Sequence, residues 1–391
     1  MPSCWVEVNL DALRHNFHVI RNLVGHDTTI IAVIKANAYG HGAVEVGRAL
    51  TAEGARYLAI TRVDEALPLR AAGVLTPILL LTPALPEELE QVVTHRLTAC
   101  LSSYEDAESL SAVAAKMKAT ARVQLKVNTG MGRLGVEQDV AVEVATQIAQ
   151  LPNLQLEAAF THFAQAAGKD TTVTHLQYSK FQPLVHYISR AANIPPQNFH
   201  CANSAALLRF PSMRLSCVRP GTILYGQFPS ALVAESAMQQ RLELRDTFAV
   251  KARIIAVKTL QPGQSVGYGS EWTARQTSRI ATIAVGYADG LSQEPQTHYV
   301  APHVALRQTL REATKQAAQM GGLKAADTPR TVLLRGQRLP IIGRISMQQC
   351  SIDITGLTDV IVGEEVTVFM RRTSAGAHLP RIYVHDPDQP A

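Results

Sequence analysis

The strongest constraint on the fold is a regular alternation in the first 225 residues. Short apolar runs recur there, and the segments between them carry apolar residues at helical spacing. The runs lie near Ile30, Tyr57, Ile78, Leu97, Val123, Leu154, Phe199 and Ser216, and the helical segments include 43–55, 63–73, 86–96 and 104–118. Eight strand-then-helix units in about 220 residues match the size of a (β/α)8 barrel. From the pattern alone, a doubly wound parallel sheet is the alternative.

After about Thr247 the residue pattern changes, and it becomes typical of strands separated by turns. Strand-rich stretches are expected at 248–269, 279–290, 331–356 and 364–372. We therefore predict a barrel over 11–240 and a β-rich C-terminal domain over 241–391. A polar, helix-like insertion at 301–322 interrupts the second domain, and we expect it to be peripheral.

Composition narrows the functional class. With 391 residues, of which 47% are hydrophobic and 18% charged, the chain is globular and long enough for two cores. It contains no run that resembles a signal peptide or a membrane span, so a soluble, cytoplasmic protein is expected. The five cysteines are scattered without a CxxC pair, which predicts free thiols and no metal site. The net charge of +5 comes from interleaved acids and bases, which favours a small anionic ligand over nucleic acid.

Polar residues stand where the predicted strands end. They are Lys35 after the first strand, Lys126 and Asn128 at the fifth, His162 after the sixth, Asn203 and Ser204 at the seventh, and Arg219, Gly221 and Thr222 at the eighth. Barrel active sites form at the carboxyl ends of the strands, so these residues are candidates for one site. The plain alternative is that strands simply stop at polar residues.

The last two strand ends suit a phosphate group. Asn203 or Ser204 can begin a helix whose free N–H groups face an anion, and Gly221 allows close approach of the backbone. Ser204 and Thr222 add hydroxyl donors. A phosphate on one side and the Lys35 amine on the other suggest pyridoxal phosphate, whose aldehyde forms a Schiff base with lysine.

Eight motifs extend this interpretation over nearly the whole chain. They are AVIKANAYGHG, LKVNTGMGRLG, FTHFAQA, HCANSAA, VRPGTILYG, VGYGSEW, VGYADG and GRISM. In order and spacing they resemble the alanine racemases, fold type III pyridoxal phosphate enzymes. The resemblance implies a (β/α)8 barrel, a β-domain that also takes up the N-terminal strand 1–10, and a head-to-tail homodimer with shared active sites. It also implies D-alanine synthesis for peptidoglycan.

The resemblance assigns roles to matching residues. Lys35 corresponds to the Schiff-base lysine, which is also one catalytic base, and Tyr268 to the opposite base, supplied by the other subunit. Tyr39 contributes to phosphate binding. Arg219 faces the pyridine nitrogen, and His162 links Arg219 to the tyrosine. Racemisation needs two bases because one removes the α-proton from one face and the other delivers a proton to the opposite face.

Three further residues are matched in the same way. Arg133 corresponds to an arginine that touches the phenolic oxygen of the cofactor and the carboxylate of the substrate. Lys126 corresponds to a lysine often found carbamylated, which would orient Arg133. Met347 corresponds to the residue whose backbone N–H helps to bind the substrate carboxylate.

Four positions depart from the family pattern at the substrate entryway. They are Gln348 in place of an aspartate, Ala167 in place of an acid, Gln293 in place of an arginine, and Ala377 in place of a phosphate-binding tyrosine. Each change removes charge or bulk, so a broader amino acid racemase that accepts serine or larger side chains is the alternative to strict alanine specificity. A decarboxylase of basic amino acids and a one-domain cofactor-binding regulator are weaker rivals, because the first lacks the NTGMGRLG and VGYGSEW pairing and the second lacks the β-domain.

Overall fold

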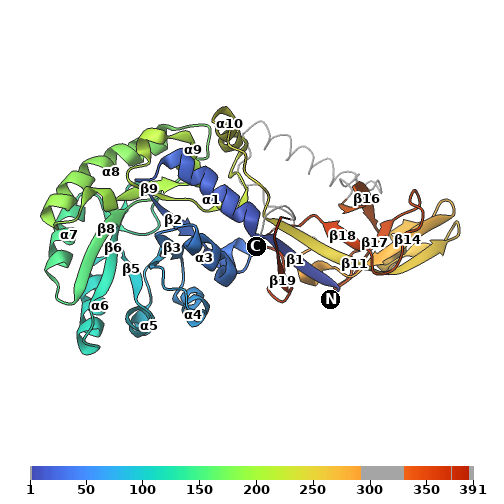
Figure 1. Cartoon of the computed structure of the whole chain (residues 1–391), viewed down its shortest axis with the longest axis horizontal. Coiled ribbons are helices and arrows are strands. Elements are labelled where there is room, and N and C mark those ends of the chain that lie inside the picture. The colour runs from blue at the N-terminus through green and yellow to red at the C-terminus, as the bar shows by residue number, and fades with distance from the viewer. Residues whose placement is uncertain (1, 292–329, 371, 387–391) are drawn as a thin grey trace. The chain divides into compact units, whose positions relative to one another are not determined.

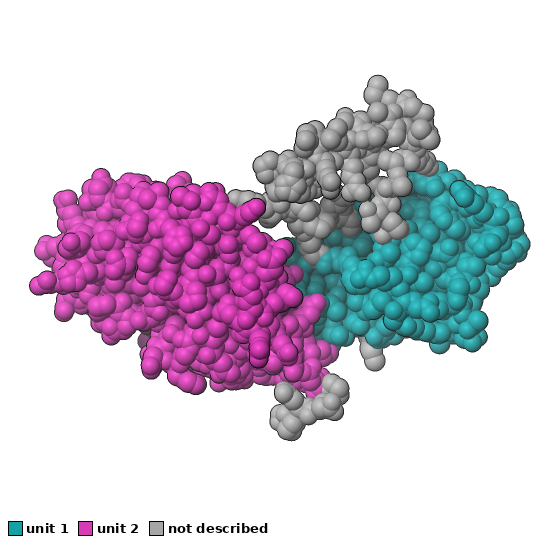
Figure 2. All heavy atoms as spheres, turned by 90° about the horizontal axis from the view of Figure 1, so that it is seen from above, with its two compact units in different colours: residues 1–8, 248–382 teal, residues 9–247, 383–391 magenta. Residues whose placement is uncertain are grey.

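The computed structural model describes residues 2–291, 330–370 and 372–386. It consists of two compact units, 1–8 with 248–382 and 9–247 with 383–391, which Figure 2 colours separately. The expected boundary at 240 therefore falls a few residues early. Asn16 of the barrel unit bonds both the N–H and the carbonyl of Arg245, at 2.7 and 2.8 Å, and so keeps the segment after 240 with that unit. The predicted insertion at 301–322 lies outside the described residues.

The larger unit is a closed parallel barrel (Figure 1). Its strands are β2 (Thr29–Val33), β3 (Tyr57–Ile60), β4 (Ile78–Leu80), β5 (Leu97–Leu101), β6 (Ala121–Asn128), β8 (Leu154–Phe160), β9 (His200–Asn203) and β10 (Cys217–Arg219), with the short β7 (Val136–Glu137) beside β6. The sheet runs β5-β4-β3-β2-β10-β9-β8-β6, and pairing of β5 with β6 closes it. The predicted (β/α)8 barrel is confirmed, and the doubly wound alternative, an open sheet, is wrong.

Helices cover the outside of this barrel (Figure 1). They are α1 (Leu10–Val24), α3 (Ala43–Ala52), α4 (Ala66–Ala71), α5 (Leu89–Thr94), α6 (Tyr104–Lys116), α7 (Ala141–Gln150), α8 (Thr172–Ala191), α9 (Ser204–Arg209) and α10 (Ala231–Gln239). Side-chain caps fix several of their starts. Asn9 Oδ1 accepts from Ala12 N at 2.8 Å before α1, and Ser103 Oγ accepts from Asp106 N at 3.1 Å before α6. The segment α2 (Lys35–Tyr39) differs from the others and belongs to the candidate site.

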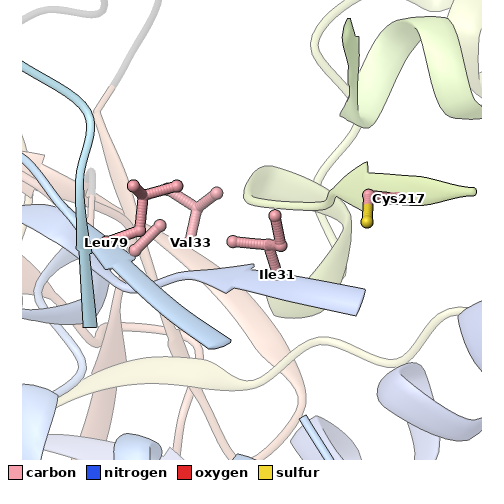
Figure 3. Packing of buried hydrophobic residues seen from close by; sticks show 5 residues of the cluster. Ile31, Val33, Leu79 and Cys217 are labelled. Carbon is pink, nitrogen blue, oxygen red and sulfur yellow. The ribbon is translucent and has the colours of Figure 1, made fainter. Parts of the chain in front are cut away.

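Apolar side chains fill the interior of the barrel. Ile31, Val33, Ala59, Leu79 and Cys217 form one buried cluster, four members of which Figure 3 labels. Full burial of a Val, Leu or Ile side chain stabilises the fold by about 1.5–3 kcal/mol. Val33 is buried as the last residue of β2, so the packing that anchors this strand also fixes where the following loop begins.

The smaller unit is β-rich. Its strands are β1 (Cys4–Asn9), β11 (Phe248–Leu260), β12 (Ser265–Val266), β13 (Trp272–Thr273), β14 (Ser278–Ile283), β15 (Thr331–Leu334), β16 (Gln337–Ile342), β17 (Cys350–Asp353), β18 (Glu365–Val368) and β19 (Arg381–Val384). The main sheet runs β14-β17-β16-β15-β18-β11-β1-β19, and β11 also pairs with β14. The N-terminal strand enters this sheet because β1 runs antiparallel to β11, with Cys4 opposite Ala252 and Val8 opposite Phe248.

The five cysteines are unpaired and buried. Burial raises the pKa of the thiols of Cys4, Cys100, Cys201 and Cys350 to about 12 and that of Cys217 to about 11, so all five remain protonated thiols near neutral pH. No helix among the described residues has both the length and the apolar content needed to cross a membrane.

Candidate functional site

The barrel brings basic side chains together at the carboxyl ends of its strands. Lys35 follows β2, Lys126 lies near the end of β6, His162 follows β8, and Arg219 ends β10. Arg219 Nη2 lies 3.4 Å from His162 Nδ1, and Asn203 Nδ2, at the end of β9, lies 3.4 Å from His162 Nε2. The positive charges of Arg219, Lys126, Arg133 and Lys35 each lower the pKa of His162. These predicted residues of the barrel unit therefore share one site.

Lys35 is half-buried just beyond the end of β2. Burial lowers the pKa of its amine, and the charge of Arg133 lowers it further, while Glu65 acts in the opposite direction. A lowered pKa raises the fraction of neutral amine at neutral pH, and the neutral amine is the nucleophilic form.

The segment after Lys35 is a left-handed turn. Ala36, Asn37, Ala38 and Tyr39 have φ values of 53°, 53°, 53° and 54°. Such backbone disfavours residues other than glycine by about 1–2 kcal/mol each. The turn ends at Gly40, whose N–H donates to Ala36 O at 3.0 Å. Strain of this kind concentrates at functional sites, where surrounding contacts maintain it.

Side chains hold both ends of this turn. The carboxylate of Glu65 accepts the Ala36 N–H, and it also accepts the Thr61 N–H at 2.9 Å. Asn37 Oδ1 accepts from Ala43 N at 2.7 Å, at the start of α3. Glu65 was missed from the sequence because it ends a short 3-10 helix after β3 (Val63–Glu65), where nothing marks it as a partner of the first strand end.

Hydroxyl groups form a cradle at the ends of β9 and β10. Gly221 N–H donates to Ser204 Oγ at 2.8 Å, and a Cβ added at Gly221 would lie 2.6 Å from Tyr39 Oη. Thr222 Oγ1 is buried and has no hydrogen-bond partner in the described part of the chain. Burial raises the pKa of Tyr39 to about 12, so its hydroxyl stays protonated. An oxyanion would give Thr222 the missing partner.

Asn203 caps the helix that begins at Ser204. Its Oδ1 accepts from Ala206 N at 3.0 Å, and its Nδ2 lies 3.4 Å from Phe163 O in addition to the contact with His162. The residue thus links the start of α9 with the loop after β8, as the sequence motif HCANSAA allows.

Arg219 is buried and held from several sides. Its Nη2 donates to Thr161 O at 2.6 Å and to Cys201 O at 3.2 Å, and its Nη1 contacts His200 Nδ1. The guanidinium also lies over the ring of Phe160, 5.3 Å from its centroid. Burial lowers the pKa of Arg219 to about 10, so it remains a cation at neutral pH.

His200 is a positioning residue that the sequence did not reveal. Its Nε2 lies 2.9 Å from Gln124 Oε1, which accepts, so Nε2 carries the proton and Nδ1 is free to accept from Arg219. Its ring stacks on Phe160 with centroids 4.9 Å apart. Burial and then Arg219 lower the pKa of His200 well below its ordinary value, which keeps it neutral. The sequence did contain a signal for His200, because an ionisable residue inside an apolar barrel strand needs a hydrogen-bond partner.

His162 is neutral for the same reasons. Burial, followed by the charge of Arg219, lowers its pKa to about 3. Gln177 fixes the loop that carries it, because Gln177 Nε2 donates to His162 O at 3.1 Å and its Oε1 accepts from Ala164 N at 2.8 Å.

Lys126 is buried beside these groups. Its Nζ donates to Leu81 O at 2.9 Å and lies 5.4 Å from the centroid of the Phe160 ring. Burial lowers the pKa of the amine, Arg219, Arg133 and Lys35 lower it further, and Cys100 opposes them. The amine is therefore neutral more often than that of an ordinary lysine.

Arg133 lies on the exposed loop after β6, and the described residues provide no ion-pair partner for it. Together with Lys35, Lys126 and Arg219 it makes the end of the barrel strongly positive. A ligand with more than one negative group suits this charge.

Tyr268 and Met347 belong to the β-rich unit, not to the barrel that carries Lys35. Both are exposed, with 69% and 59% of their surface accessible. Their loops pack together, because Gly267 lies against the backbone of Arg344. A third loop holds Met347 in place, since the Ala288 N–H donates to Met347 O at 2.9 Å. One face of this unit thus presents an exposed tyrosine close to the GRISM loop.

The unusual entryway positions are divided between the units. Ala167 lies in the barrel loop after β8, where its carbonyl accepts from Ser230 Oγ at 2.8 Å. Gln348 and Ala377 are exposed on the β-rich unit. Gln293 lies outside the described residues.

Comparison with known proteins identifies the family. A model of the alanine racemase N-terminal domain matches residues 8–229, and a model of the C-terminal domain matches 247–312 and 319–380. The chain belongs to the alanine racemase family. Alanine racemases are isomerases that act on amino acids. Matches to both domains favour this family over the decarboxylase and the one-domain regulator.

Relatives support the same assignment along the whole chain. The alanine racemase of Desulfovibrio desulfuricans is 38% identical over 93% of this chain and 88% of the relative, and that of Methanococcus maripaludis is 36% identical over the same shares. Among solved structures, the alanine racemase of Clostridium difficile 630 superposes with a TM-score of 0.85 at 30% identity, covering 99% of this chain and 97% of that one. The Bacillus anthracis alanine racemase with bound L-Ala-P has a TM-score of 0.79 at 27% identity, covering 98% of this chain and 95% of that one.

Proposed function

We propose that this protein is a cytoplasmic, homodimeric, pyridoxal phosphate-dependent racemase that interconverts L- and D-alanine and supplies D-alanine for peptidoglycan. The observation that carries the proposal is the cluster of Lys35, Lys126, Arg133 and Arg219 at the same end of the barrel as the hydroxyl cradle. Alanine racemases generally use this cofactor, and the cluster offers a site for each of its polar parts.

The residues present fit pyridoxal phosphate. Thr222 Oγ1, which is buried without a partner among the described groups, and the neutral hydroxyl of Tyr39 beside Gly221 suit the phosphate. The lowered pKa of Lys35 suits attachment to the aldehyde. When bound, the cofactor withdraws electrons from the α-carbon of the substrate and makes its C–H bond acidic.

Two bases then move the α-proton. The Lys35 amine takes or returns it on one face, and the hydroxyl of the partner subunit's Tyr268 does so on the other. Arg219, which is a cation at neutral pH, would face the ring nitrogen of the bound cofactor and, having no proton to share, would leave that nitrogen unprotonated. Arg133 binds the carboxylate of the substrate, and the Met347 backbone N–H assists.

The exposed position of Tyr268 supports a shared site. A catalytic base works in a site that excludes water, yet Tyr268 is 69% accessible on its own unit. A second copy of the chain would cover it, and twofold symmetry would then supply each barrel with one tyrosine from its partner.

The test is Lys35→Ala. We expect the variant to hold no pyridoxal phosphate that borohydride can fix to the protein, and to lose at least about 10²- to 10⁴-fold in racemase activity, because the tether and one base are removed together. Lys116→Ala, an exposed lysine on α6, is the matched control and should resemble the wild type. Cofactor fixed by borohydride in Lys35→Ala would refute the assignment.

A broader substrate range is the second candidate. Ala377 and Gln348 are exposed where the family pattern has a tyrosine and an aspartate, so this unit carries less bulk and charge at the expected entryway. A pocket wall discriminates by about 1–3 kcal/mol per methylene, so serine or lysine should gain one to two orders of magnitude relative to a strict enzyme. Measurements of kcat/KM for alanine, serine and lysine in the wild type and in Ala377→Tyr decide it. Strict alanine preference in both proteins would exclude this candidate.

A further inference from the structure

His41 is completely buried at the end of the left-handed turn, and the proposed reaction gives it no role. We propose that His41 is a positioning residue, which holds the turn of residues 36–39 in its left-handed form and thereby fixes Lys35 and Tyr39 for the cofactor. The expected effect on the cofactor rests on the proposed function. The contacts that His41 makes with the turn, here called the His41 clamp, are a property of this chain alone.

The ring of His41 is held at both nitrogens. Nδ1 lies 2.9 Å from Ala38 O, and because a carbonyl oxygen only accepts, Nδ1 carries the proton. Nε2 lies 2.8 Å from Thr247 Oγ1, at the end of the barrel unit. The turn is therefore tied through one side chain to a residue about 200 positions away, both of them fully buried.

Aromatic contacts carry the restraint to both sides of the turn. The ring of His41 packs on Tyr225 with centroids 4.5 Å apart, and Tyr225 packs on Tyr39 at 5.0 Å. Tyr225 Oη donates to Val33 O at 3.1 Å, two residues before Lys35. His41 thus touches the middle of the turn directly and reaches its two ends through Tyr225.

A restraint is needed because four consecutive residues adopt the disfavoured hand. If the turn relaxed, the backbone that connects Lys35 to Tyr39 would change direction, and the amine and the phosphate-facing hydroxyl would lose their common geometry. A histidine that merely fills the core would instead support the whole barrel equally. The two roles differ in what a substitution changes.

Three variants separate the contacts. His41→Phe keeps a ring against Tyr225 but removes both hydrogen bonds. His41→Asn keeps a donor where Nδ1 lies and loses the ring. Thr247→Val keeps volume and removes the partner of Nε2, together with the bond that Thr247 Oγ1 donates to Tyr225 O at 3.1 Å. Phe181→Leu, a fully buried change on α8, is the control for general loss of stability.

Amide hydrogen exchange of Ala38, Gly40 and Gly42 in the cofactor-free protein is the decisive measurement, since these N–H groups bond within the segment. We expect exchange about tenfold faster in His41→Phe, the effect of one buried hydrogen bond, and partial recovery in His41→Asn. Pyridoxal phosphate, titrated by absorbance, should bind about tenfold more weakly in His41→Phe. Phe181→Leu should lower Tm without either effect.

Unchanged exchange in His41→Phe, with a fall in Tm like that of Phe181→Leu, would overturn the proposal. Faster exchange with wild-type affinity for pyridoxal phosphate would overturn the positioning role. If the wild type binds no pyridoxal phosphate while amide exchange in the turn is still faster in His41→Phe, the proposed function is wrong. The restraint of the turn by the His41 clamp is then still supported. If His41→Phe does not fold, Thr247→Val decides by the same two measurements.

Discussion

The basic side chains at the end of the barrel set one another's protonation states. Lys35, Lys126 and His162 all have lowered pKa values, because burial disfavours their charge and Arg133 and Arg219 add positive potential. Lys35 and Lys126 gain neutral, nucleophilic character, while Arg219 retains its charge. A site with this composition selects anions and at the same time provides reactive amines.

Lys126 is predicted to carry a carbamate in the active enzyme. Carbon dioxide reacts only with the neutral amine, and burial together with the neighbouring cations makes that form more abundant. The product would exchange one cation for an anion among Lys35, Arg133 and Arg219. Carbon-13 NMR of the protein in labelled bicarbonate should show one carbamate signal that is absent from Lys126→Met and that fades as pH falls, because the amine is then protonated.

A crystal structure with a bare ammonium at Lys126, grown at neutral pH with bicarbonate, would contradict this prediction. Lys118→Met, on the exposed loop after α6, is the control and should leave the signal intact.

Sequence reasoning located the residues at strand ends but not those that hold them. Lys35, His162 and Arg219 were predictable because a parallel barrel brings its carboxyl ends together. Glu65, His41 and His200 were not predicted, because their roles depend on partners far away in the sequence. That Glu65 accepts the Ala36 N–H, and that the Thr247 hydroxyl lies beside Nε2 of His41, is known only from the fold.

At the scale of elements, periodicity predicted the barrel strands and the outer helices because both patterns repeat many times. Among the described residues, a run of four left-handed residues occurs only at 36–39, and local preferences oppose it. Alanine normally favours a right-handed helix, so no rule based on propensity would predict φ values of 53° at Ala36 and Ala38. The tertiary contacts of Glu65 and His41 overcome that preference.

Ala36→Gly is therefore expected to stabilise the protein. The side chain of Ala36 is exposed, so little packing is lost, and glycine removes the penalty of the left-handed backbone. The gain should be about 0.5–1 kcal/mol after the larger entropy of glycine in the unfolded chain is subtracted. Urea unfolding measures it.

The matched control is Ala112→Gly, an exposed alanine inside the right-handed helix α6. There the same substitution should destabilise by about 0.5–1 kcal/mol. Equal losses at both positions would mean that the turn at Ala36 carries no left-handed penalty in solution.

At the scale of the whole molecule, the two proposed bases belong to different units of the chain. The amine of Lys35 belongs to the barrel, and Tyr268 is exposed on the β-rich unit. The proposed dimer makes a specific prediction about which copies must cooperate. Each site combines Lys35 of one subunit with the partner subunit's Tyr268.

Heterodimers of Lys35→Ala and Tyr268→Phe test this arrangement directly. In a shared-site dimer, the Tyr268→Phe barrel keeps its lysine and receives an intact tyrosine from the other chain, so one of two sites is complete. Coexpression with two different tags and sequential purification isolates the heterodimer. Its activity should be about half that of the wild-type dimer and far above either parent.

The reciprocal heterodimer pairs the wild type with a chain that carries both Lys35→Ala and Tyr268→Phe. If sites are shared, one site lacks the lysine and the other lacks the tyrosine, so this dimer should show little activity. If each chain instead supplies both of its own bases, the wild-type chain keeps a complete site. The dimer of wild type and double variant should then have about half of the wild-type activity, and the dimer of the two single variants should have little. Both dimers contain the same two substitutions, so a difference in activity between them cannot come from stability and reports only which subunit supplies the second base.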